Sequence, residues 1–224
     1  MMKKSLLLQA LTKFLLGVVV LGVLIFFSAG SFRFWNGWLL MGVLFVPMFV
    51  AGLILLAKNP QLLAKRLNAK EEQQEQKMVV ALSGMLFVAV FVLAGLNWRF
   101  RWCILPNWVV WIATLLFLLS YILYAEVLRE NAYLSRTIEI QENQKVIDRG
   151  LYGIVRHPMY MATTLLFLSM PLVLGSLVSF FVMLLYLPLI VKRIRNEETV
   201  LETGLEGYKE YKKRVKYRLL PFVW

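Results

Sequence analysis

The sequence has few of the side chains that bind metal ions or form disulfide bonds. Its 224 residues include one cysteine and one histidine. Because Cys103 has no second cysteine to pair with, an internal disulfide and any multi-cysteine metal site are excluded, and we predict no metal. No two glycines are separated by a single residue. The Gly-x-Gly turn with which many soluble enzymes hold nucleotide cofactors is therefore missing as well.

Charged residues are also scarce, at 17%, whereas 60% of the residues are hydrophobic and the mean hydropathy is +0.68. Soluble domains have roughly 45–50% apolar residues, so most of this chain is expected to lie in lipid. A membrane-spanning helix needs about 20 mainly apolar residues. Four such runs cover residues 6–27, 38–57, 78–96 and 108–125.

A fifth apolar region, residues 159–191, is long enough for two helices that turn near Gly175 and Ser176. The predicted fold is an all-α, polytopic integral membrane bundle of about six transmembrane helices. The number is five if the last region does not make two full crossings. We divide this one membrane domain into a scaffold of four helices, residues 1–125, and a catalytic part, residues 126–224.

The net charge of +12 comes from an uneven distribution of basic residues. No nucleic-acid-binding motif accompanies it, so we predict no nucleic-acid partner. Lysine and arginine near the ends of spans are retained in the cytoplasm. They are frequent before the first span, after the second, after the fourth and after the last, whereas the opposite loops hold only Arg33, Arg99 and Arg101. We predict a multi-pass cell-membrane protein with cytoplasmic termini, whose basic surface attracts anionic lipid.

Two polar segments on the predicted cytoplasmic side interrupt the apolar pattern. Residues 126–156 form a connection longer than the 12–15 residues above which connections tend to be functional or disordered, and apolar anchors within it predict that it is ordered. After Asn196 the pattern predicts a helix that continues the last span, then an amphipathic helix on the membrane surface. A third polar stretch, residues 70–77, is interpreted as a solvated helical connector without a function.

Arg156, His157 and Pro158 stand where the polar connection enters an apolar helix. Proline suits the first turn of a helix. The free N–H groups and the positive end of the dipole at that turn favour a carboxylate. The alternative is an Arg-His pair that anchors the chain among lipid headgroups.

Arg193 and Glu197 are four residues apart and therefore share one face of a helix. They form either an ordinary surface ion pair or a clamp. In a clamp the glutamate would bind an ammonium group, and the arginine a carboxylate or phosphate.

Taken together, these motifs resemble the isoprenylcysteine carboxyl methyltransferase family over roughly residues 131–222. The matching residues are Asn131, Ser135, Ile140, Gln141, Gly150, the run Arg156-His157-Pro158-Met159-Tyr160, the pair Glu197-Glu198, Leu201, Tyr208, Tyr211, Val215 and the run Leu220-Pro221-Phe222.

The resemblance implies an integral membrane methyltransferase that holds S-adenosylmethionine between its last helices and its C-terminal segment. Arg193 would then be the catalytic residue that faces the methyl acceptor. The implied cofactor-binding residues are Gln141, Gln144, Lys145, Val146, Ile147, Tyr152, His157, Pro158, Met159, Tyr160 and Glu197.

Three classes of function follow from these observations. The first is methyl transfer to a small or amphiphilic acceptor reached from the membrane. A carboxylate is the acceptor most like that of the family, and thiol, phenol and phospholipid amine acceptors are also compatible. The second is an NADPH-dependent sterol or enone reductase, because related membrane folds carry a similar Arg-His-Pro turn. The third is a transporter or scaffold, for which the spans contain few of the expected ionisable residues.

Overall fold

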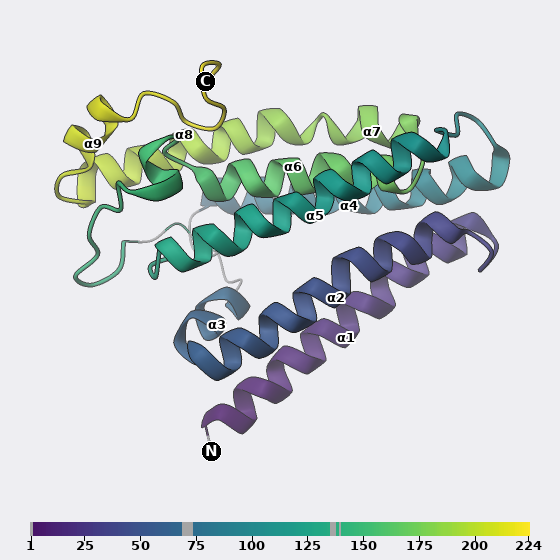
Figure 1. The fold of residues 1–224 in the computed structure, drawn as a ribbon, viewed down its shortest axis with the longest axis horizontal. Coiled ribbons are helices and arrows are strands. Elements are labelled where there is room, and N and C mark those ends of the chain that lie inside the picture. Colours follow the sequence, from purple (N-terminus) through teal and green to yellow (C-terminus); the bar gives the residue numbers. More distant parts are fainter. Residues whose placement is uncertain (1, 69–73, 135–137, 139) are drawn as a thin grey trace.

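The protein is an all-α, polytopic membrane bundle (Figure 1). The computed structural model describes residues 2–68, 74–134, 138 and 140–224. The long helices in these ranges are α1 (Met2–Ala29), α2 (Trp35–Lys58), α4 (Gln74–Phe100), α5 (Asn107–Glu130), α6 (Pro158–Val173) and α8 (Tyr186–Gly204). The short ones are α3 (Pro60–Leu67), the 3-10 helix η1 (Gly150–Gly153), α7 (Leu177–Met183) and α9 (Tyr208–Arg214).

Five helical segments of the described residues are long and apolar enough to cross a membrane, and α7 with α8 counts as one of them. The first four predicted spans are confirmed as α1, α2, α4 and α5. The predicted turn after α6 is also confirmed: Gly175 has a φ of 69°, and the Ser176 hydroxyl accepts a hydrogen bond of 3.2 Å from the Ser179 N–H to cap α7. The 16 residues of α6 extend about 24 Å, less than the roughly 30 Å of a hydrocarbon core.

Three turns meet at one end of the bundle. The Leu105 N–H, in the loop between α4 and α5, donates a hydrogen bond of 3.0 Å to the Gly175 carbonyl, in the turn between α6 and α7. At the start of α2 the Asn36 amide donates to the Val173 carbonyl over 3.1 Å. The chain therefore crosses back and forth between this end and the opposite one, near which both termini lie (Figure 1).

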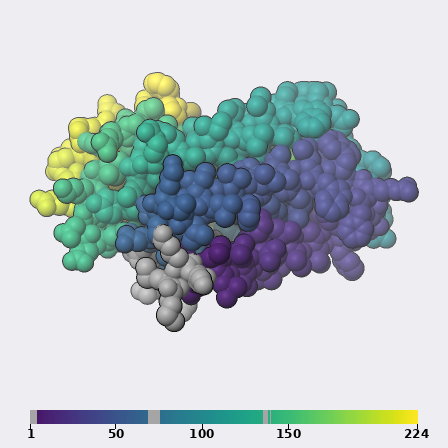
Figure 2. Space-filling model, turned by 60° about the horizontal axis from the view of Figure 1, so that its bottom comes forward, coloured from purple at the N-terminus to yellow at the C-terminus, as the bar shows by residue number. Residues whose placement is uncertain are grey.

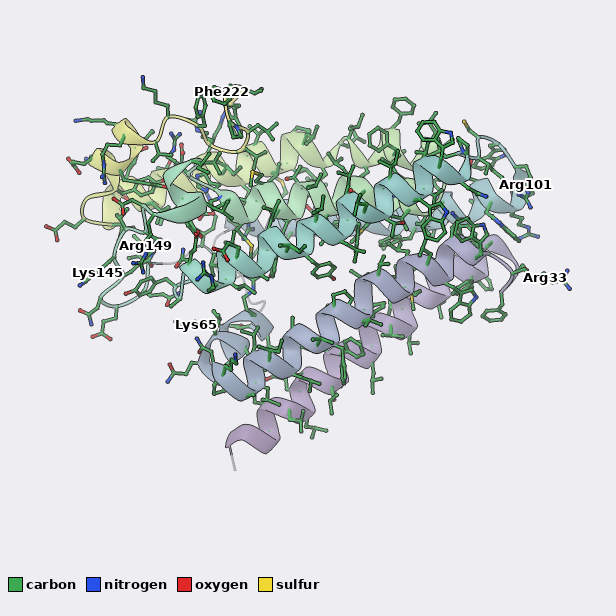
Figure 3. All side chains as sticks on the ribbon, in the orientation of Figure 1. Arg33, Lys65, Arg101, Lys145, Arg149 and Phe222 are labelled. Carbon is green, nitrogen blue, oxygen red and sulfur yellow. The ribbon has the colours of Figure 1, made fainter. Side chains whose placement is uncertain are left out.

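Polar atoms gather at these two ends, whereas the middle of the bundle carries mainly carbon side chains (Figure 3). Arg33 and Arg101 lie at the end with the three turns, and Lys65, Lys145 and Arg149 lie at the other. This distribution is typical of a protein that spans a bilayer, because the hydrocarbon core disfavours charge.

The central core joins α1 to α4, α5 and α6. Ile25, Ala94 and Phe117 are fully or almost fully buried in it. The contact between α1 and α4 is close, since a Cβ atom on Gly95 would lie only 2.7 Å from the Ile25 carbonyl oxygen. From the side shown in Figure 2, the helices α1 to α3 form a layer along the remainder of the bundle.

The last span is interrupted between α7 and α8. Pro188 has no N–H to donate to the Leu184 carbonyl four residues earlier, and that carbonyl instead accepts a hydrogen bond of 3.0 Å from the Leu187 N–H. After this break α8 continues beyond the apolar region to Gly204, as the sequence predicted.

The C-terminal segment is attached to the bundle through Glu198, whose side chain is 4% exposed. Its Oε1 accepts from Arg156 Nε at 2.7 Å, and its Oε2 accepts from Arg218 Nε at 2.9 Å. The backbone N–H groups of Arg156 and His157 donate to the Tyr217 and Arg218 carbonyls, each over 2.9 Å. These contacts join the connection before α6, helix α8 and the tail into one unit.

Replacing Glu198 with glutamine is expected to destabilise this unit strongly. Removal of one partner from a buried ion pair costs about 3–5 kcal/mol, because the arginines are left uncompensated. Glu202→Gln is the matched control: it removes the ion pair with Lys212, whose side chain is 34% exposed, and it should cost less than about 1 kcal/mol. Unfolding in detergent and proteolysis of the tail measure both variants. Equal stability losses would contradict the structural role of Glu198.

Candidate active site

A cavity of about 950 Å³ lies between the helices. This volume is near the upper limit of small-molecule sites, roughly 300–1,000 Å³. One part of its wall is apolar and comes from α1, α2, α4 and α6, including Phe14, Leu44, Phe87 and Leu166. The other part is polar and comes from the connection before α6, from α6 and α8, and from the start of α9. The cavity thus brings a polar region and a lipid-like region together.

The connection before α6 is fixed to the end of α5. The Glu130 carboxylate accepts a hydrogen bond of 3.0 Å from the Leu151 N–H. Gly150 has a φ of 58° and leaves room for that carboxylate, which a Cβ atom at this position would overlap. The Asn131 amide donates to the Tyr152 hydroxyl over 2.9 Å, so the Tyr152 ring is held in the cavity wall.

Tyr160 links the two residues of the predicted clamp. Its hydroxyl donates a short hydrogen bond to the Glu197 carboxylate and accepts one of 3.0 Å from Arg193 Nε. Because Glu197 is only half-buried and lines the cavity, its carboxylate is a candidate for binding a cationic group. The arrangement places an acid, a phenol and a guanidinium side by side.

His157 stands at the start of α6 and is 4% exposed. Its Nε2 lies 3.4 Å from Glu198 Oε1, and its ring stacks on Tyr160 with 5.7 Å between the centroids. Among the residues that the structure describes, no side chain caps this helix start. The first-turn N–H groups, which have no partner within the helix, therefore add positive potential beside the cavity residues Met159 and Tyr160.

Ten of the twelve predicted site residues line this one cavity: Gln144, Lys145, Val146, Ile147, Tyr152, His157, Met159, Tyr160, Arg193 and Glu197. The other two, Gln141 and Pro158, are outside the described lining. The Gln141 side chain donates to the Tyr133 carbonyl over 2.6 Å and accepts from Lys65, so it stabilises the fold of the connection before α6. Pro158 is buried as the first residue of α6. Ser135, one residue of the family resemblance, lies outside the described residues.

Sequence reasoning did not assign a role to Gln76, which is completely buried in α4. Its Oε1 accepts a hydrogen bond of 3.0 Å from Arg193 Nη1. Gln76 belongs to the polar stretch 70–77, interpreted above as a solvated face. That interpretation is wrong for Gln76, and residues 70–73 of the stretch lie outside the described ranges. The sequence feature that could have indicated its burial is its position two residues before the apolar run 78–96.

Tyr208 was part of the family resemblance but was not among the predicted site residues. It is 4% exposed and lines the cavity, and its hydroxyl has no hydrogen-bond partner in the part of the chain that the structure describes. Burial raises the pKa of this phenol well above its ordinary value, and the charges of Glu198 and Glu197 raise it further. The hydroxyl is therefore protonated at neutral pH and is a hydrogen-bond donor.

Part of this chain is similar to known proteins. A family model described as phospholipid methyltransferase matches residues 108–206, from the first turn of α5 to just beyond α8. A Delta(14)-sterol reductase of Mus musculus is 34% identical over 91 residues, which are 39% of this chain and 22% of the reductase. The chain thus matches only about a fifth of that relative's length. The family match supports an integral membrane methyltransferase with an unspecified acceptor and agrees at this level with the resemblance found in the sequence.

Proposed function

We propose that this protein is an S-adenosylmethionine-dependent integral membrane methyltransferase whose acceptor is an amphiphile. The observation that carries the proposal is the cavity, in which the Glu197, Tyr160 and Arg193 cluster borders an apolar space between helices. The phospholipid methyltransferase match over residues 108–206, which include the three residues of this cluster, supports the reaction class.

The polar part of the cavity fits the functional groups of S-adenosylmethionine. Glu197 offers a carboxylate for the ammonium group. The uncapped first turn of α6 suits the carboxylate, while Val146, Ile147 and Tyr152 form a wall against which an adenine can pack. The Tyr208 hydroxyl, which has no partner within the described ranges, is available to donate to an oxygen or ring nitrogen. The bound cofactor would supply an electrophilic methyl group on its sulfonium.

Arg193 lines the cavity beside Tyr160 and is proposed to orient the acceptor. Methyl transfer depends mainly on alignment of the reacting atoms at about 3–3.5 Å. A carboxylate acceptor is already ionised at neutral pH, so a positioned guanidinium suffices without a general base. Apolar residues of α1, α2 and α4 would hold the apolar tail of the acceptor. Thiols, phenols and phospholipid amines are further acceptors that such a cavity can take.

A reductase is the second candidate, because the chain shares 34% identity over 91 residues with the mouse sterol reductase. Such an enzyme would bind NADPH instead of the methyl donor. The two candidates therefore differ in a property that is measured without knowledge of the acceptor.

Binding of S-adenosylmethionine and NADPH to the protein in detergent tests this choice. We expect saturable binding of S-adenosylmethionine only, at least tenfold weaker in Glu197→Ala because a charge-assisted contact is lost. His157→Ala should also weaken it, since the start of α6 loses its ring contacts. Thermal unfolding of each variant serves as the control. Binding of NADPH alone would favour the reductase, and binding of neither ligand by folded protein would refute both candidates.

Tyr208 and Tyr211 provide a matched pair of tyrosines. Tyr208→Phe removes an unpartnered hydroxyl, so it should leave stability unchanged and weaken S-adenosylmethionine binding about tenfold. The Tyr211 hydroxyl instead donates to the Tyr152 carbonyl over 2.7 Å, and Tyr211→Phe should lower stability by about 1–3 kcal/mol. Calorimetric binding and unfolding measurements on both variants check these expectations. Unchanged affinity in Tyr208→Phe would remove this residue from the proposed site.

The site and both termini are proposed to face the cytoplasm, on the basis of the basic residues at that end. Single cysteines at exposed Arg33 and Arg149, in a Cys103→Ser background, test the orientation because these residues lie at opposite ends (Figure 3). A membrane-impermeant maleimide added to intact cells should label the cysteine at position 33 and leave that at position 149 unmodified until the cells are opened. The reverse pattern would invert the topology.

A further inference from the structure

The outer face of α8 carries a recess that is separate from the large cavity. None of its lining residues lines the cavity, to which α8 contributes Arg193 and Glu197 from another face. The recess begins at Pro188, the residue that interrupts the helical hydrogen bonds of the last span. Its lining residues are Pro188, Val191, Lys192, Arg195, Asn196 and Thr199.

Helix α8 separates its acidic residues from two of its basic residues. The Glu197 carboxylate bonds to Tyr160, and Glu198 is buried against the tail. Lys192 and Arg195 are exposed and line the recess. The described lining of the recess contains no acidic residue, so this face of α8 has a positive charge.

The two cations of the recess have no counter-ion in the chain. The ion pairs found among the described residues involve neither Lys192 nor Arg195. Because they are three residues apart on a helix, their Cβ atoms are about 5–6 Å apart. One phosphate group has enough anionic oxygens to accept charge-assisted hydrogen bonds from both. The Thr199 hydroxyl donates to the Arg195 carbonyl over 3.1 Å, so the two cations are the donors of this face.

An exposed apolar strip continues from the recess toward the middle of the span. Phe181 and Leu185 are each 60% exposed, and steps of four, three and four residues lead from Phe181 through Leu185 and Pro188 to Lys192. This spacing keeps the four residues on one face. At 1.5 Å per residue the strip extends about 16 Å, close to half of the roughly 30 Å of a hydrocarbon core. Its length therefore matches the acyl region of one leaflet.

We propose that the outer face of α8 binds one anionic phospholipid of the surrounding leaflet. Its phosphate lies between Lys192 and Arg195, and an acyl chain lies along Leu185 and Phe181. Charge complementarity selects the lipid, because the two cations attract a net negative headgroup and repel the ammonium group of a zwitterionic one. The site lies outside the cavity, so it does not depend on the proposed methyl transfer.

General attraction between a basic protein surface and anionic lipid predicts a different result from a defined site. If the attraction is general, any two exposed basic residues contribute equally to it. Lys209 and Lys213 on α9 provide the comparison, since both are exposed and their replacement removes the same charge. A defined site instead requires Lys192 and Arg195.

The experiment is native mass spectrometry of the full chain in detergent with dioleoyl phosphatidylglycerol or dioleoyl phosphatidylcholine. We expect wild type to bind phosphatidylglycerol at least tenfold more tightly. The double variant Lys192→Gln/Arg195→Gln should bind the two lipids within about twofold of each other, because the charge-assisted contacts are lost. Lys209→Gln/Lys213→Gln and the charge-conserving Arg195→Lys should keep most of the preference. Unfolding temperature establishes that each variant is folded.

Equal binding of both lipids to wild type would overturn the site. Equal losses in the α8 and α9 double variants would also overturn it, since this is the result of general attraction. Inorganic phosphate, added in excess over the lipid, distinguishes the source of the bound group. Complete displacement of phosphatidylglycerol would show that the recess binds free phosphate and would refute a lipid site, whereas retention of the lipid supports the contribution of the apolar strip.

Discussion

The burial of the Glu198 carboxylate is the constraint on which the remaining geometry of the site depends. A buried carboxylate is tolerated only where cationic partners offset its loss of hydration. Here Arg156 supplies one from the connection before α6, and Arg218 supplies another from the tail. Arg156 also donates to the Val215 carbonyl over 2.6 Å, which orders the tail beside the start of α6. The polar wall of the cavity consists of these same segments. A substitution of Glu198 would therefore alter the polar wall of the cavity by shifting the backbone of these segments.

Adjacent acidic residues have different roles because neighbouring side chains on a helix point in different directions. Glu198 faces the arginines and is enclosed by protein, whereas Glu197 faces Tyr160 and the cavity. Arg156 also lines the cavity, but its guanidinium is bound to Glu198 and to two backbone carbonyls of the tail, whereas Arg193 contacts Tyr160 beside Glu197. The two residues of the Glu197-Glu198 pair thus differ in their access to a ligand.

The sequence predicted the spans well, because lipid requires long apolar helices and the hydropathy of a run measures this directly. It also predicted the turn at Gly175, where a flexible residue precedes a helix-capping serine. Most predicted site residues reached the cavity because they lie in a few short segments before α6 and along α8. The roles of Gln76, Tyr208 and Gln141 could not be predicted: each depends on a contact or a missing contact with a distant segment. Gln76, for example, meets Arg193, which is 117 positions away.

The division of the cavity also bears on how such an enzyme would choose its acceptor. The matched region, residues 108–206, supplies most of the polar wall, to which we assign cofactor binding in the proposed function. The apolar wall comes largely from α1, α2 and α4, all of which precede that region. Because an apolar wall discriminates weakly between tails that differ by single methylene groups, tail selection alone would be permissive. Strong discrimination requires buried polar groups that only the correct headgroup satisfies, and such groups belong to the polar wall of the cavity.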